Sequence, residues 1–234
     1  MNIIITGASS GVGFEAVIEL IQSGKHKIIA LSRSHDKLER LLEITNSLNP
    51  DNELFALTFD IVHDDYAALQ QFIAANFDNR VDILINNAGV LINKPFTDLL
   101  ETDFVEMLQS NFIGHVRMIQ GMVDLMPAGS HIVNIGSMGG FQGSVKFPGL
   151  SAYSASKAAL HTLTECLAQE FADKDIRVNC LALGSAQTEM LEKAFPGYES
   201  PVMAFEMGKY IADFALTGQR FFNGKVLPVA LSTP

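Results

Sequence analysis

The chain has 234 residues, of which 48% are hydrophobic and 18% are charged, and its formal net charge is −10. This length suits one α/β domain with a sizeable core, and the composition excludes a disordered or highly solvated chain. The negative charge argues against nucleic acid and anionic membranes as partners, because both require basic surfaces.

Apolar runs and helical periodicities alternate along the whole chain, and they predict alternating strands and helices. Strands are expected at residues 3–5, 27–31, 54–59, 81–85, 131–135, 177–183 and 225–229. Helices are expected at residues 13–23, 36–48, 66–77, 97–126, 151–171 and 202–216. Strands joined by helices of this length pair in parallel through right-handed crossovers. The sequence therefore predicts one α/β domain over residues 1–234, a Rossmann-type doubly wound, mostly parallel seven-stranded sheet with helices on both faces.

Targeting segments and metal-ligand patterns are not expected in this sequence. No apolar run approaches the length of a membrane span, and the first residues enter a strand-like run without the basic start of a signal peptide. We therefore expect a cytoplasmic protein. Cys166 and Cys180 form neither a disulfide framework nor a metal-ligand spacing, and the six histidines are scattered, so no metal is expected.

A glycine-rich turn, TGASSGVG at residues 6–13, joins the first strand to the first helix. Glycines allow a tight turn and let a pyrophosphate approach the backbone, while free N–H groups at the helix start bind its charge. The spacing differs from the general G-x-G-x-x-G fingerprint, and such a turn can also be structural only, but its position favours dinucleotide binding. The residues expected to contact the cofactor here are Gly7, Ser9, Ser10, Gly11, Val12 and Gly13.

The end of the second strand bears on the choice between the two nicotinamide cofactors. An acidic residue at this point usually binds the ribose 2′-hydroxyl of NAD. The chain has Ser32 and Arg33 instead. A guanidinium group pairs with a 2′-phosphate, whereas a carboxylate would repel it. The sequence therefore favours NADP(H), although a lone arginine can also be a solvated loop charge, and NAD(H) stays open as the alternative.

Tyr153 and Lys157 lie four residues apart, so on a helix they share one face. A free tyrosine has a pKa of about 10 and exchanges protons poorly at neutral pH. A neighbouring ammonium group favours the phenolate and brings the pKa of the phenol toward the range useful for acid–base catalysis. Alone, this pair is also compatible with an ordinary amphipathic helix.

In combination, these features resemble the short-chain dehydrogenases/reductases over essentially the whole chain. The matching motifs are T-G-x-x-x-G-x-G at residues 6–13, N-N-A-G at residues 86–89, and Tyr153 with Lys157. Further matching positions are Asp60, Asn111, Ser137, Gly184 and Thr188. Each motif is weak to moderate alone, but their occurrence together, in order, is improbable by chance.

The resemblance implies four catalytic residues. Tyr153 would be the general acid/base at the carbonyl oxygen, and Lys157 would hold the nicotinamide ribose and lower the pKa of Tyr153. Ser137 would hydrogen-bond the substrate oxygen and stabilise its developing charge. Asn111 would hold a water molecule that links Lys157 to solvent, although it could instead mark a simple helix bend.

The resemblance also implies further cofactor contacts. Asp60 and Ile61 would contact the adenine ring, although Asp60 could instead cap the following turn. Asn87, Ala88 and Gly89 would line the adenosine ribose. Thr188 would orient the nicotinamide carboxamide and so select the hydride that is transferred.

The chain departs from the family pattern in three places. The interval from Ser137 to Tyr153 is longer, with the extra residues around 143–147, and this loop is expected to shape specificity. Leu183 replaces the usual proline after the sixth strand. The segment 189–200 is short, and the C-terminus lacks the usual acidic-glycine ending. A short lid suggests an open site or one completed by a neighbouring subunit, and its apolar residues suit a partly apolar substrate or simply pack the lid.

The sequence thus predicts an NADP(H)-dependent oxidoreductase that interconverts a small-molecule ketone or aldehyde with an alcohol. A cofactor-binding sensor with little or no catalysis is the alternative from another class, and an isomerase or dehydratase is a third. The resemblance implies a homodimer or homotetramer formed through the helices at 97–126 and 151–171. The apolar stripes of these helices could equally be core faces against the sheet.

Overall fold

A computed structural model describes residues 1–231, so the last three residues of the predicted domain lie outside the described part. Within residues 1–231, seven strands form one sheet in the order β3-β2-β1-β4-β5-β6-β7. They are β1 (Asn2–Thr6), β2 (Lys27–Ser32), β3 (Glu53–Thr58), β4 (Ile83–Asn86), β5 (His131–Ser137), β6 (Arg177–Leu183) and β7 (Val226–Val229). All neighbouring strands pair in parallel, which confirms the predicted doubly wound sheet and shows that it is parallel throughout.

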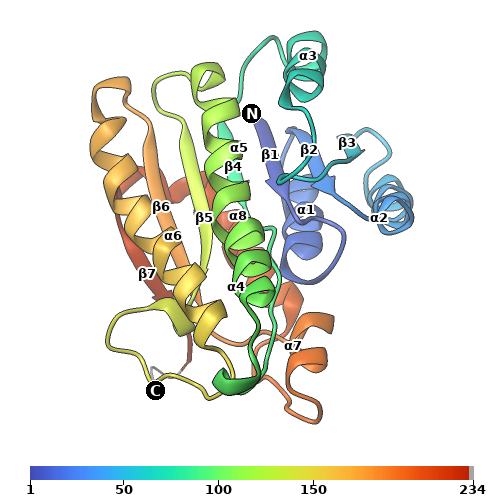
Figure 1. Cartoon of the computed structure of the whole chain (residues 1–234). Coiled ribbons are helices and arrows are strands. Elements are labelled where there is room, and N and C mark those ends of the chain that lie inside the picture. The colour runs from blue at the N-terminus through green and yellow to red at the C-terminus, as the bar shows by residue number, and fades with distance from the viewer. Residues whose placement is uncertain (232–234) are drawn as a thin grey trace.

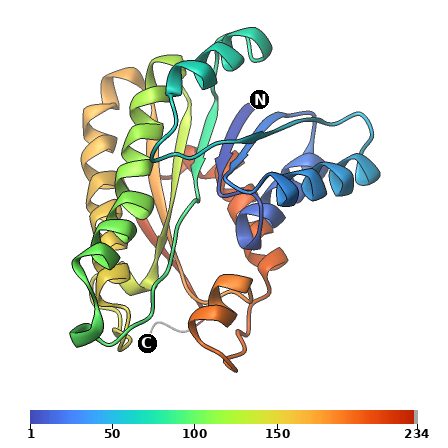
Figure 2. The same cartoon turned by 45° about the vertical axis from the view of Figure 1, so that its right-hand side comes forward.

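Helices cover both faces of this sheet (Figures 1 and 2). They are α1 (Gly11–Ser23), α2 (His35–Leu48), α3 (Tyr66–Asn76), α4 (Glu101–Leu108), α5 (Gly114–Met122), α6 (Ser151–Glu170), α7 (Glu189–Ala194) and α8 (Ala204–Thr217). Helices α1, α2 and α8 pack against one face, and α3, α5 and α6 pack against the other. The sheet is therefore the middle layer of three.

The first strand shows how the sequence produces the two cores. Ile3 and Ile5 are fully buried against α1 and α8, whereas Ile4 is fully buried against the opposite helices. Successive side chains of a strand point to opposite faces, so a strand covered on both sides needs a continuous apolar run. Full burial of each such side chain stabilises the folded state by about 2 kcal/mol. The run at residues 3–5 therefore places β1 in the centre of the sheet.

The helical stretch predicted over residues 97–126 is confirmed over residues 101–125, which form one uninterrupted helical run, but residues 99 and 100 separate this run from a first turn. The structure has a 3₁₀ turn at Phe96–Asp98, then α4, a π-helical turn at Gln109–Ile113, α5, and a last 3₁₀ turn at Val123–Leu125. The π turn contains Asn111, for which the sequence left open a simple helix bend as the alternative to a catalytic role. A π turn adds about one residue to a helical turn, and such turns often lie at functional sites.

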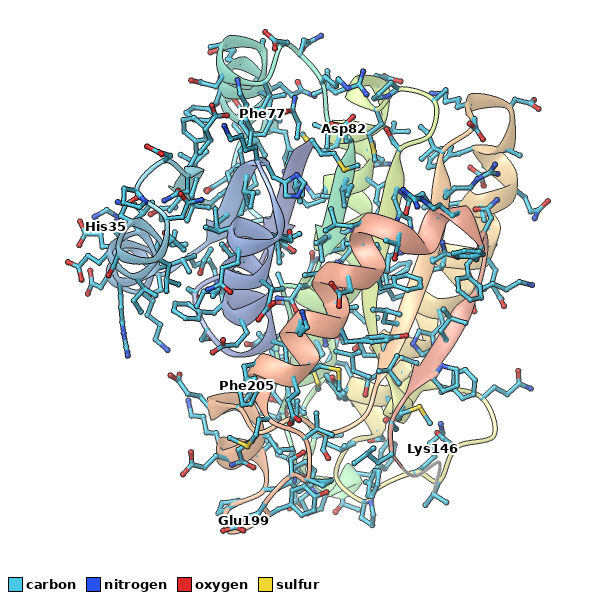
Figure 3. All side chains as sticks on the ribbon, turned by 180° about the vertical axis from the view of Figure 1, so that it is seen from behind. His35, Phe77, Asp82, Lys146, Glu199 and Phe205 are labelled. Atoms are coloured by element: carbon cyan, nitrogen blue, oxygen red, sulfur yellow. The ribbon has the colours of Figure 1, made fainter. Side chains whose placement is uncertain are left out.

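The carboxyl ends of the strands lie along the lower edge of the molecule in Figure 1, together with α7. The same edge carries Lys146, from the long loop before α6, and Glu199, from the segment after α7 (Figure 3). Phe77 and Asp82 lie at the opposite edge (Figure 3). In open α/β sheets, ligands bind outside the carboxyl ends of the strands. None of the helices in residues 1–231 is long and apolar enough to cross a membrane.

Candidate active site

A cavity of about 600 Å³ opens at the carboxyl edge of the sheet. All predicted cofactor residues and three of the four predicted catalytic residues line it. They are Gly7, Ser9, Ser10, Gly11, Val12, Gly13, Ser32, Arg33, Asp60, Ile61, Asn87, Ala88, Gly89, Ser137, Tyr153, Lys157 and Thr188. Asn111 lies behind the wall, next to Ser110, which does line the cavity. The fold thus gathers residues from six strand ends into one site.

The glycine turn packs directly against the end of β4. Gly7 has a left-handed φ of +68°, and a Cβ atom on it would lie 2.7 Å from the Cα atom of Ala88. A Cβ atom on Gly13 would lie 2.2 Å from Nδ2 of Asn87. Ser10 caps α1 without a side-chain hydrogen bond, so the N–H groups of the first helical turn keep their capacity to bind an anion. The turn therefore fits a pyrophosphate group.

Thr6 holds the N-N-A-G segment in place, a role that sequence reasoning did not assign. Its Oγ1 atom accepts hydrogen bonds from the N–H groups of Asn87 and Ala88, both at 3.0 Å. The Asn87 amide donates to the carbonyls of Thr6 and Gly7 at 3.0 and 3.1 Å. These bonds fix the ends of β1 and β4 relative to each other.

His115 supports the same segment from α5 and was also missed. Its Nε2 atom lies 2.8 Å from the carbonyl oxygen of Ala88. Burial lowers the pKa of His115 to about 3, and the nearby charge of Lys157 acts in the same direction. The imidazole is therefore neutral at pH 7 and donates its Nε2–H to Ala88. Its position one turn after Asn111 on the helix was the available sequence signal.

Ser32 and Arg33 line the cavity together with the glycine turn. The Ser32 hydroxyl donates to the Ser9 hydroxyl at 2.6 Å, so β2 and the turn are joined by a polar pair. Arg33 is exposed. It is also close to Asp60: although burial acts to raise the pKa of Asp60, hydrogen bonds from Val62 and His63 and the charges of His63 and Arg33 lower it overall. Asp60 also accepts the Val62 N–H at 2.8 Å, so it does cap the following turn.

Ser137 and Tyr153 meet at the end of β5. The Ser137 Oγ atom accepts the N–H of Gly139 at 3.1 Å. Burial raises the pKa of Tyr153, and the nearby Ser137 side chain offsets part of that rise. The expected lowering by Lys157 is therefore wrong for this structure. The two residues do share one helix face, but the Lys157 Nζ atom lies 6.0 Å from the centroid of the phenol ring.

Lys157 is 4% exposed and donates a hydrogen bond to the carbonyl oxygen of Ile135 at 2.8 Å. Burial lowers the pKa of Lys157 to about 8, against the opposing effect of Cys180. The side chain is thus anchored to β5 rather than to the phenol. It remains mostly charged at pH 7.

Asn111 connects three segments behind the cavity wall. Its Oδ1 atom accepts the Val90 N–H at 2.8 Å, and its Nδ2 atom donates to the Val90 carbonyl and to the Ser156 hydroxyl, both at 3.0 Å. A Cβ atom on Gly89 would lie 2.9 Å from Asn111 Oδ1 and 3.5 Å from Lys157 Nζ. Asn111 therefore lies close to Lys157, but its side chain is used to hold Val90 and α6 together.

The outer part of the cavity is formed by α7 and its neighbours. Thr188 caps α7 by accepting the Leu191 N–H at 3.2 Å, and its Cγ2 atom faces Gly11. Leu183, which replaces the usual proline, is the last residue of β6 and pairs with Val229. The lining of this part is mostly apolar. It includes Met138, Phe147, Leu150, Met190, Phe195 and Val202.

The helix α7 was not predicted, although Thr188 as a cap followed by Glu189 is a recognisable start signal.

On the helices proposed for subunit contacts, some apolar side chains are buried in the core of this chain and others are exposed. Met107, Met118 and Leu160 are fully buried in this chain, whereas Leu108 is 40% exposed. Within residues 1–231, no group of three or more His, Cys, Asp or Glu side chains is placed to hold a metal ion.

A family model described as short chain dehydrogenase matches residues 1–199. The chain belongs to the short-chain dehydrogenase family. This short-chain dehydrogenase is 29% identical to an uncharacterized oxidoreductase of Staphylococcus aureus over 222 residues, 94% of this chain and 92% of the relative. It is 31% identical to nodulation protein G of a Rhizobium species, over 86% of this chain and 79% of the relative.

Solved structures of other short-chain dehydrogenases superpose on this one along almost their whole length. One from Shigella flexneri, complexed with NADP, has a TM-score of 0.86 and 25% identity over 97% of this chain and 95% of its own. One from Serratia marcescens has a TM-score of 0.83 and 26% identity over the same shares. The similarity confirms the predicted family and the predicted Rossmann-type fold.

Proposed function

We propose that this short-chain dehydrogenase is an NADP(H)-dependent oxidoreductase that interconverts a ketone or aldehyde with an alcohol. The observation that carries the proposal is that Ser137, Tyr153 and Lys157 line the same cavity as the glycine turn. Groups that can bind a carbonyl oxygen and transfer a proton thus lie in the same cavity as a pyrophosphate site. Residues 1–234 would act as one domain.

The bound cofactor supplies the hydride for this reaction. The residues of the glycine turn would hold its phosphates, and Asn87, Ala88 and Gly89 would line its adenosine ribose. Asp60 and Ile61 would lie against its adenine, Lys157 would bind the nicotinamide ribose, and Thr188 would orient the carboxamide. The packing of Gly7 and Gly13 against the N-N-A-G segment supports this assignment, because no side chain could replace either hydrogen there.

Ser137 and Tyr153 would act on the substrate oxygen. The Ser137 oxygen already accepts the Gly139 N–H, so its own hydroxyl proton is available for the substrate. The raised pKa of Tyr153 keeps the phenol protonated at neutral pH, which is the form needed to donate a proton during reduction. Lys157, bonded to β5, would present a positive charge to the nicotinamide ribose, and this charge persists to a pH of about 8.

The preference for NADP(H) rests on the polar pair beside Arg33. A 2′-phosphate placed near Ser9 and Ser32 would find two hydroxyl groups and a guanidinium group, and β2 ends without a carboxylate to repel it. The NADP complex of the Shigella flexneri relative is consistent with this choice.

We further propose a homodimer or homotetramer. Large apolar side chains of α4 and the turn before it are exposed, which suits contact with a second copy of the chain. They include Phe96, Leu100, Val105 and Leu108.

The proposed reaction is tested by NADPH and NADH oxidation, measured side by side with ketones, diketones, quinones and 3-oxoacyl thioesters. We expect NADPH-dependent reduction of at least one carbonyl class. Clear preference for NADH would overturn the cofactor assignment. Tight NADPH binding without turnover on any carbonyl would overturn the enzymatic proposal in favour of a cofactor sensor, and turnover without net cofactor consumption would indicate an isomerase or dehydratase.

A further inference from the structure

His161 lies one helical turn after Lys157, on the face of α6 that packs against β5, and it is only 7% exposed. Its Nε2 atom accepts the main-chain N–H of Ser137 at 3.4 Å. The main chain of Gly140 also lies near the ring, where it favours the protonated form of the imidazole. One imidazole therefore bonds to the start of the turn that carries Ser137 and lies near its end.

The backbone leaves room for this imidazole at Gly136. A Cβ atom there would lie 2.3 Å from Nε2 of His161 and 2.7 Å from Sγ of Cys180. The ring thus occupies space that any other residue at position 136 would take. At the far end of the turn, a Cβ atom on Gly140 would lie 2.6 Å from the main-chain nitrogen of Ala158. Both ends of the turn therefore pack closely against α6, and the imidazole of His161 fills the space beside Gly136.

We propose that His161 is a positioning residue that acts through Ser137, by fixing the main chain of residues 137–140 so that the Ser137 hydroxyl is aimed at the substrate oxygen. This inference rests on the proposed function, because it assumes that Ser137 binds that oxygen. The same turn directs Gly139 N–H onto Ser137 Oγ at 3.1 Å, so a shift of the main chain would also turn the hydroxyl away. Misplacement of a reacting group by about 1 Å can lower a rate by roughly 100-fold.

The bonding pattern requires a neutral ring protonated on Nδ1, since Nε2 must accept from Ser137. The surroundings favour the neutral form: burial lowers the pKa of His161 to about 4, and the charges of Lys157 and Lys146 act in the same direction. A histidine that merely filled the core would need no particular tautomer. The Nδ1-protonated form is therefore a distinct consequence of the positioning role.

The kinetic test is a double-mutant cycle between His161→Leu and Ser137→Ala. We expect His161→Leu to lower kcat by about 10- to 100-fold in the wild-type background, with the NADPH dissociation constant changed less than about twofold. In the Ser137→Ala background the same change should lower kcat less than about threefold, because the group it positions is gone. Equal losses in both backgrounds would overturn the proposal.

His161→Gln is the conservative variant, since its amide can both accept and donate, and it should recover most of the kcat lost in His161→Leu. His131→Gln is the matched control, because His131 is a buried histidine on β5 that bonds to Ala215 and Asn179 at the opposite edge of the sheet. Its effect on kcat should be the same with and without Ser137. If His161→Leu does not fold, the cycle is run with His161→Phe, which keeps an aromatic ring and removes both nitrogen atoms.

A spectroscopic readout separates this inference from the proposed reaction. The ¹⁵N spectrum of the histidine side chains at pH 7 should show His161 protonated on Nδ1 and bare on Nε2. The opposite tautomer would overturn the proposal whether or not the protein is active.

If no carbonyl is reduced, the proposed function fails, and the rate of amide hydrogen exchange at residues 137–140 then tests the positioning role. Exchange at least about tenfold faster in His161→Leu supports it, and unchanged exchange contradicts it.

Discussion

Asn87 donates two hydrogen bonds to Thr6: its main-chain N–H to Thr6 Oγ1 and its side-chain amide to the Thr6 carbonyl, both at 3.0 Å. Thr6 ends β1 and begins the glycine turn, and Asn87 directly follows the adjacent strand β4. Because Thr6 is fully buried, water cannot replace its hydroxyl. The pair therefore fixes the floor of the proposed cofactor site.

Thr6→Val keeps the shape of the side chain and removes its hydroxyl, so the N–H groups of Asn87 and Ala88 lose their acceptor. We expect the free energy of unfolding to fall by about 2 kcal/mol, because buried unpaired donors are unfavourable. The NADPH dissociation constant should rise at least about tenfold. Urea unfolding and a fluorescence titration measure the two effects.

The matched control is Thr6→Ser, which keeps the acceptor and loses one methyl group. It should stay within about 1 kcal/mol of the wild type. Equal destabilisation by valine and serine would show that the methyl group, and not the hydroxyl, carries the role of Thr6.

Arg33→Ala should raise the KM for NADPH about 10- to 100-fold and change the KM for NADH less than about threefold. The reason is that the variant lacks the guanidinium group, so the 2′-phosphate of NADPH loses a charge-assisted hydrogen bond, whereas NADH has no 2′-phosphate. Arg40→Ala, which removes another exposed arginine, on α2, is the control and should leave both values unchanged. Equal effects of Arg33→Ala on the two cofactors would contradict the assignment.

The positions of the strands could be predicted because most of them are dominated by apolar residues, as the two-sided burial of a parallel sheet requires. The strand expected at residues 177–183 agrees with β6 to the residue. The π turn between α4 and α5 could not be predicted, since apolar residues on either side of it still repeat at near-helical spacing. Within this turn, Asn111 bonds to Val90, 21 residues earlier in the chain. Sequence periodicity does not report a contact of that range.

The residues of the site also divide into those that the sequence could predict and those that it could not. Tyr153, Arg33 and the glycines could be proposed for the site from residue type and spacing, and they do line one cavity. Supporting residues were missed: Thr6, His115 and His161 act through hydrogen bonds to the main chain of other segments. The expected lowering of the pKa of Tyr153 failed for a related reason. Spacing placed Lys157 on the right face, but only the structure shows its bond to Ile135 and the burial of the phenol.

Acid should destabilise the folded protein between about pH 6.5 and pH 4 through buried neutral histidines. Burial lowers the pKa of His131 to about 4 from 6.5, so in this interval the unfolded chain binds a proton that the folded chain does not. The free energy of unfolding therefore falls as the pH falls through this interval, by about 2 kcal/mol between pH 6.5 and 4.5 for this one residue.

His131→Gln removes that titration, so its free energy of unfolding should depend less on pH by about the same 2 kcal/mol. Urea unfolding at pH 6.5 and 4.5 measures the difference, with the exposed His35→Gln as the control. An identical pH dependence in wild type and His131→Gln would show that His131 is already protonated or is solvated in the folded state.

The role of Tyr153 as the proton donor and acceptor is the central claim, and Tyr153→Phe tests it most directly. Tyr198→Phe is the matched control, because Tyr198 also lines the cavity but its hydroxyl lies 3.3 Å from Ser185. With a carbonyl substrate from the panel, Tyr153→Phe should lower kcat at least about 1,000-fold and change the NADPH dissociation constant less than about threefold, whereas Tyr198→Phe should keep its turnover. A Tyr153→Phe protein that retains more than about a tenth of the wild-type kcat would contradict the account.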